Sequence, residues 1–481
     1  MTNIIGNHVG GSRVSQTGGT LQDVFNPSTG EVSAQVRLSS SKELDAVVQV
    51  ASEAAVAWGA TPPAKRAQVM YRFKRLLEDN ADKIASSISS EHGKTHDDAL
   101  GEVARGMEAV EFSCGIPHLL KGTFSEQVAT SIDVYSIPQS LGVVAGITPF
   151  NFPAMVPMWM FPNALACGNA FILKPSERDP SVTLILADLL KDAGLPDGVF
   201  SVVQGDKVVV DAILDNPEIK AVSFVGSTPV AEYIYTRGAA NGKRVQALGG
   251  AKNHMIIMPD ADMDQVVDAL MGAGYGSAGE RCMAISVPVP VGEKVADELM
   301  DRMVPLVEKL LVGPPSDPNA AMGPVITKQS LERITSLLQS GVDQGAKLLV
   351  DGRGLKVPRN ENGFFIGASL FDQVTPEMDI YKEEIFGPVL STVRVADYEA
   401  AIKLIHNNQY ANGVAIFTRD GDAARDFVNS IQVGMVGIIV PIPVPVGYHS
   451  FGGWKKSLFG SHHIYGPDTI HFYTRLKAVT S

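Results

Sequence analysis

One cysteine of this sequence stands in surroundings that could make it a nucleophile. Cys282 follows the segment Tyr275-Gly-Ser-Ala-Gly-Glu-Arg281, so glycines lie shortly before it and an arginine directly before it. Glycine lets a substrate approach the backbone closely, and a neighbouring cation favours the thiolate form of a thiol. Taken alone, such a segment is more often structural than catalytic. The other two cysteines, Cys114 and Cys167, are expected to pack as small apolar side chains.

Four other segments carry side chains that could assist a nucleophile or bind a ligand. The first places an amide in a proline-rich turn, and the second places an ammonium and a carboxylate at a strand end, where they can bind sugar hydroxyls. The third is a strand-to-helix turn that could receive a pyrophosphate, and the fourth joins a carboxylate to an aromatic ring. They are Thr148-Pro-Phe-Asn-Phe-Pro153, Leu173-Lys-Pro-Ser-Glu177, Phe224-Val-Gly-Ser-Thr228 and Glu383-Glu-Ile-Phe-Gly-Pro388.

Each of these segments also has a plain structural explanation. Lys174 could be a solvated surface residue, and Phe386 could belong to a core. The turn at Gly226 lacks the GxGxxG pattern and could be an ordinary helix cap. A single segment is therefore weak evidence for an active site, and the four segments must be interpreted together with Cys282.

The elements that must position these residues follow from periodicity. The segment from Phe25 to Glu31 is typical of a turn between strands, and Ser41 is expected to cap the first of several helices that fill the chain to about residue 120. From Ser131 onward, short apolar strands alternate with helices, which indicates βαβ units and a parallel sheet. A second alternating block follows residues 249–250. We therefore expect two α/β lobes that meet near residue 250.

Length and composition limit the class of protein. The chain has 481 residues, of which 45% are hydrophobic and 19% charged, and its formal charge is −12. At roughly 150 residues per domain this suggests about three structural units with a large core. The acidic balance argues against a nucleic-acid partner and against a polybasic membrane anchor. Three scattered cysteines argue against a disulfide scaffold and a CxxC metal site, so we expect no metal.

Two long stretches, Val134–Leu173 and Phe427–Trp454, carry no charged side chain and have the length of membrane spans. Both contain several prolines, whereas a spanning helix needs about 20 apolar residues without repeated breakers. We expect buried loops and strands instead, with no membrane partner. The N-terminus shows no basic region followed by an apolar stretch, so we expect a cytoplasmic protein.

Together, in this order and spacing, these segments resemble the aldehyde dehydrogenase superfamily. The resemblance extends from Asn26-Pro-Ser-Thr-Gly30 through Met322-Gly-Pro324 to Ser450-Phe-Gly-Gly453. It implies an α/β fold with two Rossmann-like lobes, one for the cofactor and one for catalysis, plus a small β extension. The cofactor lobe would comprise residues 1–121 and 140–249, the catalytic lobe 250–440, and the oligomerisation extension 122–139 and 441–481. A homotetramer, built as a dimer of dimers, is the expected assembly.

The resemblance also implies roles for the candidate residues. Cys282 would attack the aldehyde, and Asn151 would bind the oxyanion together with the N–H of the cysteine. Lys174 and Glu177 would hold the adenosine ribose of NAD, Glu384 the nicotinamide ribose, and Phe386 would pack by the nicotinamide. The full expected cofactor site is Phe150, Lys174, Glu177, Arg178, Gly226, Ser227, Glu384 and Phe386.

These roles agree with the chemistry of aldehyde oxidation. An aldehyde hydrate is a poor hydride donor, whereas a thiohemiacetal alkoxide collapses readily and expels hydride. The protein must provide a nucleophile, an oxyanion hole and a fixed hydride distance. The carboxylate of Glu177 would repel a 2′-phosphate, so we expect NAD rather than NADP.

One departure from the superfamily pattern indicates to which branch of the superfamily this sequence is similar. Hydrolytic members carry a water-activating glutamate 34 residues before the cysteine, and that position here is Leu248, or Ala247 when the following Leu-Gly-Gly letters are matched. Without this base, a Cys282 thioester should resist water but still react with a thiolate. The departure and three segments resemble the CoA-acylating methylmalonate-semialdehyde dehydrogenase branch. The segments are Gly250-Ala-Lys-Asn-His254, Gly279-Glu-Arg-Cys-Met283 and Val440-Pro-Ile-Pro-Val-Pro445.

This branch oxidises methylmalonate or malonate semialdehyde with NAD and CoA, and yields propionyl-CoA or acetyl-CoA with loss of CO2. Its substrate carboxylate would be held by Arg105 and Arg281, because a planar guanidinium meets a carboxylate in two parallel hydrogen bonds. Phe451 would also line the substrate site. Otherwise Arg105 would be read as a solvated helix residue, and Arg281 could instead lower the pKa of Cys282.

Other readings remain open at the level of sequence. Ile439 replaces an asparagine expected in this branch, and Ala231 replaces a glycine common in the superfamily. A hydrolytic dehydrogenase acting on another carboxylated semialdehyde could recruit Glu383 or Glu280 as its base. A catalytically silent scaffold and a cysteine hydrolase that uses His254 as base are further alternatives.

Overall fold

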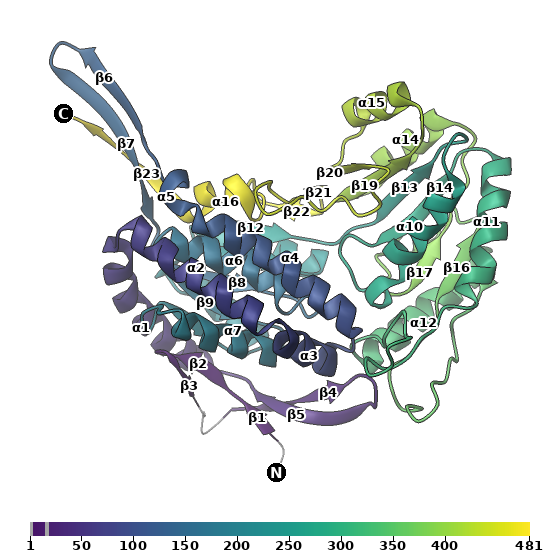
Figure 1. Ribbon diagram of the computed structural model, residues 1–481, viewed down its shortest axis with the longest axis horizontal. Coiled ribbons are helices and arrows are strands. Elements are labelled where there is room, and N and C mark those ends of the chain that lie inside the picture. The colour runs from purple at the N-terminus through teal and green to yellow at the C-terminus, as the bar shows by residue number, and fades with distance from the viewer. Residues whose placement is uncertain (1–2, 15–18) are drawn as a thin grey trace.

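The computed structural model describes residues 3–14 and 19–481, and two α/β lobes lie side by side in it (Figure 1). The last parallel strand of the first lobe is β12 (Arg244–Leu248), and the second lobe begins with β13 (Asn253–Ile257). The expected fold class with two α/β lobes is therefore confirmed, and the chain passes from one sheet to the other between β12 and β13.

The first lobe is built on an eight-stranded sheet of order β22-β12-β11-β8-β9-β10-β2-β3. Its five central strands are parallel, whereas β2, β3 and β22 are antiparallel additions at the edges. The strands are β2 (Asn7–Val9), β3 (Ser12–Val14), β8 (Val143–Ile147), β9 (Ala170–Lys174), β10 (Phe200–Val202), β11 (Ile219–Val225), β12 and β22 (Leu458–Phe459).

The order of these strands has a topological switch point between β8 and β11. From β8 the chain proceeds to β9 and β10 on one side, and then crosses to β11 and β12 on the other side. At such a switch point the two neighbouring connections leave in opposite directions, and ligands bind there in open α/β sheets. Three of the candidate segments directly follow β8, β9 and β11.

The helices of the first lobe cover both faces of this sheet. The first, α1 (Ser41–Ala60), begins after the N-cap Ser40, which forms a capping box with Glu43. The expected cap at Ser41 is therefore wrong by one position, because the acid three residues after Ser40 completes the box. The others are α2 (Pro63–Asp79), α3 (Ala81–His92), α4 (His96–Cys114), α5 (Ile116–Leu119), α6 (Met155–Ala166), α7 (Ser181–Asp192), α8 (Lys207–Asp215) and α9 (Thr228–Ala240).

The uncharged stretch from Val134 to Leu173 contains a helix as well as strands. All twelve residues of α6 are buried, although Pro162 lies inside the helix. The expectation of only loops and strands here is wrong, because a helix buried on every side shows no apolar periodicity. In the described ranges, no helix combines the length and apolarity needed to cross a membrane.

The second lobe contains a parallel four-stranded sheet of order β14-β13-β19-β20 and a smaller sheet of order β15-β16-β17. Its strands are β13, β14 (Ile285–Pro290), β15 (Lys347–Val350), β16 (Ser369–Asp372), β17 (Val389–Ser391), β19 (Gly413–Phe417) and β20 (Met435–Ile438). Its helices are α10 (Met263–Tyr275), η1 (Gly276–Gly279), α11 (Glu293–Val307), α12 (Lys328–Asp343), α13 (Asp379–Lys382), α14 (Tyr398–Asn407) and α15 (Gly421–Ser430). A further small sheet joins β1 (Asn3–Ile5), β5 (Glu31–Arg37) and β4 (Leu21–Asn26), and the predicted turn lies between the last two.

Another three-stranded sheet projects from the first lobe as an arm (Figure 1). It consists of β6 (Thr123–Ala129), β7 (Ile132–Ser140) and β23 (Thr474–Thr480), all antiparallel. Of the segment 441–481 that was expected to belong to this extension, only β23 pairs within it. Before α16 (Gly466–Tyr473), β21 (Trp454–Lys455) pairs with β18 (Tyr410–Ala411) and β22 pairs with β12, so this part of the chain joins the two lobes.

Candidate active site

The loop that carries Cys282 has an unusual backbone. Directly before it, Ser277 and Ala278 adopt positive φ angles of 50° and 54°, which are costly for residues with side chains. Asp98, in the first turn of α4, holds this loop because one of its carboxylate oxygens accepts hydrogen bonds from both the N–H and the hydroxyl of Ser277, each at 3.1 Å. The loop is therefore fixed by a side chain that lies far away in the sequence.

The main chain at Cys282 is held as well. Its carbonyl oxygen accepts hydrogen bonds from the side-chain amides of Asn253 at 2.9 Å and Asn412 at 3.2 Å. Asn253 also donates to the carbonyl of Ala284. These contacts fix the position of the thiol relative to the sheet of the second lobe.

The thiol of Cys282 is not activated in this arrangement. Burial raises its pKa to about 12, and the carboxylate of Glu384 acts in the same direction. The guanidinium of Arg281 instead lies 2.7 Å from a carboxylate oxygen of Asp98. The expected lowering of the thiol pKa by Arg281 therefore has no support in the geometry.

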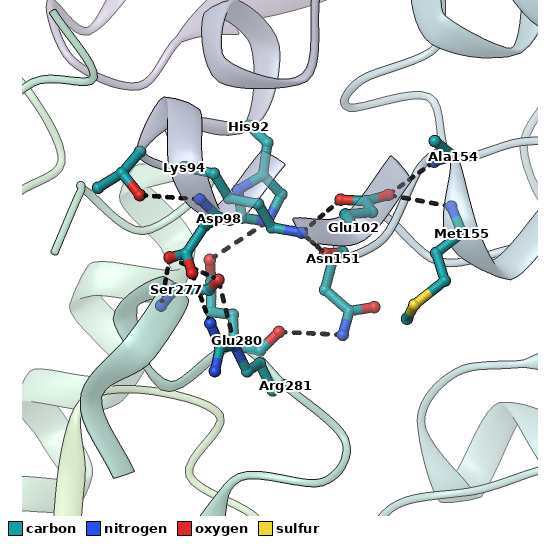
Figure 2. Close-up of polar contacts among 11 residues, drawn as sticks. His92, Lys94, Asp98, Glu102, Asn151, Ala154, Met155, Ser277, Glu280 and Arg281 are labelled. Carbon is teal, nitrogen blue, oxygen red and sulfur yellow. Dashed lines mark hydrogen bonds and ion pairs between the residues drawn. The ribbon is translucent and has the colours of Figure 1, made fainter. Parts of the chain in front are cut away.

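Asn151 lies in the turn after β8 and faces the nucleophile loop (Figure 2). One N–H of its buried side chain donates to the carbonyl oxygen of Glu280 at 3.0 Å, two residues before the cysteine. A carboxamide has two N–H donors. The second is left for another acceptor, as an oxyanion-binding residue requires.

Two residues that the sequence motifs did not reveal, Lys94 and Glu102, contact the turn that carries Asn151 (Figure 2). The Nζ of Lys94 is 2.5 Å from the main-chain oxygen of Asn151 and 2.6 Å from Glu102. No motif marks Lys94, which stands in the turn between α3 and α4. A signal existed for Glu102, because Asp98, Glu102 and Arg105 are spaced to share one face of a helix.

At the end of β9, Lys174 and Glu177 form an ion pair with 2.9 Å between nitrogen and oxygen. The guanidinium of Arg178 lies 4.9 Å from the centre of the Phe150 ring, and this ring packs edge-on against Phe386 at 5.9 Å. These five expected cofactor residues therefore form two adjacent groups at one end of the first-lobe sheet.

The helix α9 starts where the third candidate segment was expected to bind a pyrophosphate. Its N-cap Ser227 makes no side-chain capping hydrogen bond, although Pro229 has no N–H and the N–H of Val230 already donates to the carbonyl oxygen of Ser227 at 3.1 Å. Such a helix terminus suits an anion. At Gly226, a Cβ atom would lie 2.4 Å from the ring of Phe224, so the close approach requires glycine.

Cys282, Glu384 and Phe386 line one cavity, together with Arg281 and Lys252. One oxygen of Glu384 accepts a hydrogen bond from the N–H of Ala251 at 2.9 Å. Burial raises the pKa of Glu384 to about 7, although the Ala251 N–H and Lys252 act against it. The chemistry of these features matches a dinucleotide. The ion pair of Lys174 and Glu177 suits a ribose, the N-terminus of α9 suits a pyrophosphate, and the cavity with Glu384 and Phe386 suits a ribose and its nicotinamide.

Of the three expected substrate residues, Arg105 and Arg281 line different cavities, and Phe451 lines neither of the two. Arg105 lines a second cavity with Trp159 and Tyr465, and its guanidinium contacts Glu108 at 2.8 Å and the carbonyl oxygen of Val444 at 3.1 Å. The ring of Phe451 packs against Trp159 at 5.0 Å, beside Tyr465. Arg281 lines the cysteine cavity instead.

The bases considered for a hydrolytic enzyme do not line the cysteine cavity. The fully buried carboxyl of Glu280 lies 3.8 Å from His92 and near the N–H of Ile326, and Glu383 is exposed. The proposed hydrolase base His254 is bonded to the hydroxyl of Tyr381, and burial lowers its pKa to about 3. Among the described residues that line this cavity, Glu384 is the one carboxylate.

Ile439, noted as a departure in the sequence, adopts a positive φ of 57°. This conformation is unfavourable for a β-branched residue and is tolerated by asparagine. The expected asparagine would therefore suit the backbone better at this exposed position.

Comparisons with known proteins extend this description. A model of the aldehyde dehydrogenase family matches residues 14–479. A malonate-semialdehyde dehydrogenase of Pseudomonas aeruginosa is 60% identical over 98% of this chain and 95% of its own, and an acylating mitochondrial methylmalonate-semialdehyde dehydrogenase of Arabidopsis thaliana is 49% identical over 98% of this chain and 78% of its own.

Solved structures are similar over the whole chain. A methylmalonate-semialdehyde dehydrogenase of Oceanimonas doudoroffii has a TM-score of 0.98 at 58% identity, and covers 100% of this chain and 98% of its own. A candidate enzyme of the same kind from Sinorhizobium meliloti 1021, complexed with NAD, has a TM-score of 0.99 at 60% identity with the same coverage.

Proposed function

This chain belongs to the aldehyde dehydrogenase family, and we propose that it oxidises malonate or methylmalonate semialdehyde with NAD and transfers the product acyl group to CoA with loss of CO2. The substrate class is supported by the names of the similar enzymes from Pseudomonas, Arabidopsis and Oceanimonas. Transfer to CoA is supported by one observation above all: buried Ala247 and Leu248 stand where hydrolytic members of the family carry their water-activating acid.

The first step is the addition of Cys282 to the aldehyde carbon. The thiol loses its proton to water, a carbon–sulfur bond forms as the carbonyl π bond breaks, and the carbonyl oxygen becomes an alkoxide. The second N–H of Asn151 and the main-chain N–H of Cys282 would donate to this oxygen. Fixed donors at a developing negative charge stabilise the transition state in a water-poor site.

The residues at the carboxyl ends of β8, β9 and β11 fit NAD. Lys174 and Glu177 would bind the adenosine ribose, the N-terminus of α9 the pyrophosphate, and Glu384 the nicotinamide ribose. Phe386 would pack against the nicotinamide in the cavity that Cys282 also lines, and Phe150 would support the ring of Phe386. When bound, NAD supplies the hydride acceptor for the oxidation.

After oxidation the acyl group remains on Cys282 as a thioester. Water is a poor nucleophile without a base, whereas a thiolate is a strong one, so the thiolate of CoA would displace the cysteine and release it for another cycle. The substrate carboxylate leaves as CO2 during the sequence, and the carbon that carried it takes up a proton from water.

The substrate carboxylate would be held mainly by Arg105. Its guanidinium lines a cavity with Trp159 and Tyr465, whose rings pack together with that of Phe451. Arg281 can contribute a second contact, because a guanidinium has five N–H donors and the contacts to Asp98 and Ser277 use only some of them.

The projecting arm supports the expected homotetramer. Phe124 and Leu476 are 64% and 69% exposed on it, and its outer strands β6 and β23 each pair on one side only with strands of the described residues. Such edges can form hydrogen bonds with a strand of another chain. Light scattering after size exclusion should give four times the chain mass, and a monomer would contradict the assembly.

Product analysis tests the proposed reaction. The enzyme would be incubated with NAD, CoA and methylmalonate semialdehyde labelled with ¹³C in the carboxylate, and the products would be identified by mass spectrometry. We expect propionyl-CoA without label and labelled CO2. Free propionate or methylmalonate in place of the CoA ester would support the hydrolytic reading instead.

A further inference from the structure

We propose that the buried ion pair of Lys94 and Glu102 positions Asn151 for its contact with the substrate oxygen. This inference rests on the proposed function, because it assigns the pair a task in aldehyde oxidation. Both residues lie outside the sets expected to touch substrate or cofactor. They are therefore positioning residues, which act through Asn151.

The pair is completely enclosed. The side chains of Lys94 and Glu102 are both 0% exposed, and 2.6 Å separates the nitrogen from the carboxylate oxygen. Lys94 turns a second donor to the main-chain oxygen of Asn151 at 2.5 Å, and its ammonium lies 3.9 Å from the centre of the Phe152 ring. One cation thus contacts two consecutive residues of the oxyanion turn.

Glu102 holds the other end of the same turn (Figure 2). Its second oxygen accepts hydrogen bonds from the N–H groups of Ala154 at 2.8 Å and Met155 at 3.1 Å. These groups begin α6, which has no side-chain cap from its own N-cap residue. A carboxylate at a helix N-terminus satisfies unpaired donors and interacts well with the helix dipole.

The contacts constrain Asn151 from two sides. Lys94 donates to its main-chain oxygen, and the carbonyl oxygen of Glu280 accepts a hydrogen bond from its side chain. Because Glu280 belongs to the nucleophile loop, any shift of the turn would change the direction of the second amide N–H relative to Cys282. The pair thereby sets the geometry of the oxyanion contact.

Stability alone gives little reason to bury these charges. Well-packed apolar residues can replace a buried ion pair at equal or greater stability. Apolar residues cannot, however, supply the directional hydrogen bonds to Asn151, Ala154 and Met155. The pair is therefore better explained by the geometry that it imposes than by the energy that it adds.

The decisive experiment is a double-mutant cycle with Asn151. The first variant, Lys94→Met with Glu102→Gln, removes both charges at similar volume and retains an oxygen for Ala154 and Met155. The second is Asn151→Ala, and the third combines all three changes. The rate of the first NADH burst in a single turnover, with NAD and the semialdehyde, would be measured for each.

Removal of one oxyanion donor costs about 10²–10³-fold in rate, and a displaced donor should lose a large part of this. We expect the pair variant to slow the burst by about tenfold or more on its own, but by less than about threefold once Asn151 is alanine. Equal slowing in both backgrounds, or no slowing in the first, would overturn the proposal.

Two readouts separate positioning from general damage. Alkylation of Cys282 by iodoacetamide creates no oxyanion, so its rate should stay within about twofold in the pair variant, and the dissociation constant for NAD should also be unchanged. An alkylation rate reduced by the same factor as the burst would mean that the pair merely supports the fold. Asp372→Asn, which breaks a 2.8 Å ion pair with Arg394 in the other lobe, serves as the matched control and should leave the burst rate unaltered.

Two failures remain distinguishable. If the wild-type enzyme gives no burst, the proposed function fails before any variant is considered. If the pair variant does not fold, the same cycle with Glu102→Gln alone decides. This change keeps the volume of the glutamate side chain and leaves Lys94 in place. It should also slow the burst only while Asn151 is present.

Discussion

The guanidinium of Arg281 lies 2.7 Å from Asp98, so the residue next to the nucleophile is tied to the first turn of α4. Glu102 and Arg105 follow on the same face of this helix, at spacings of four and three residues. Asp98 contacts the nucleophile loop, Glu102 the turn of Asn151, and Arg105 the cavity near Tyr465. One helix face therefore aligns three parts of the active site.

Replacement of Asp98 tests this alignment. Asp98→Ala leaves Arg281 without its partner and removes the acceptor that holds Ser277 in a left-handed conformation. We expect kcat to fall about tenfold or more, together with a lower melting temperature, since an unpaired partly buried charge costs on the order of 1–3 kcal/mol. Asp98→Asn keeps a hydrogen-bond acceptor, so its kcat and its melting temperature should fall by less. A variant Asp98→Ala with unchanged kcat would contradict the alignment.

Arg105→Leu tests the substrate contact. A charge-assisted hydrogen bond to a carboxylate contributes about 1.5–3 kcal/mol, so KM for malonate semialdehyde should rise roughly tenfold or more. KM for propanal, which has no carboxylate, should change by less than about twofold. Arg302→Leu, a replacement of an exposed arginine on α11, is the control. Equal losses on both aldehydes would remove Arg105 from the substrate site.

The raised pKa of Cys282 predicts the pH dependence of its reactivity. In the enzyme without ligands, the thiol is protonated at neutral pH, so its alkylation rate should rise about tenfold per pH unit and show no plateau below pH 9. Glu384→Gln removes the negative charge beside the thiol and should increase the rate at pH 8. Peptide mass spectrometry after iodoacetamide treatment measures this at Cys282 specifically. A plateau near pH 7 would mean that a cation activates the thiol after all.

Cys282→Ala tests the nucleophile itself. Turnover should disappear, because no thiohemiacetal can form, whereas the affinity for NAD measured by fluorescence titration should stay within about twofold. Cys167→Ala removes a buried cysteine elsewhere and should retain activity. Residual turnover in Cys282→Ala above the level of a blank would exclude covalent catalysis by this residue.

The sequence allowed the candidate site to be assembled because its segments are local and follow strands. Asn151, Lys174 and Gly226 come shortly after or at the ends of β8, β9 and β11, and parallel neighbouring strands bring their carboxyl ends together. Residue types and topology therefore sufficed to group them.

Long-range partners could not be predicted in this way. Adjacency in sequence suggested that Arg281 acts on Cys282, but its carboxylate partner Asp98 lies 183 residues away. Likewise, nothing local links Lys94 to Asn151, from which 57 residues separate it. Helix α6 escaped prediction for a different reason, since burial on all sides removes the polar face that periodicity needs.

The central claim is that a Cys282 thioester forms and that CoA, not water, resolves it. It is tested most directly by following NADH from methylmalonate semialdehyde and NAD, first without CoA and then with CoA added. The account predicts a burst of about one NADH per active site that then stops, followed by sustained turnover as soon as CoA is present. Steady turnover without CoA would contradict it, because water would then have to be activated at Cys282 by a group other than the missing glutamate.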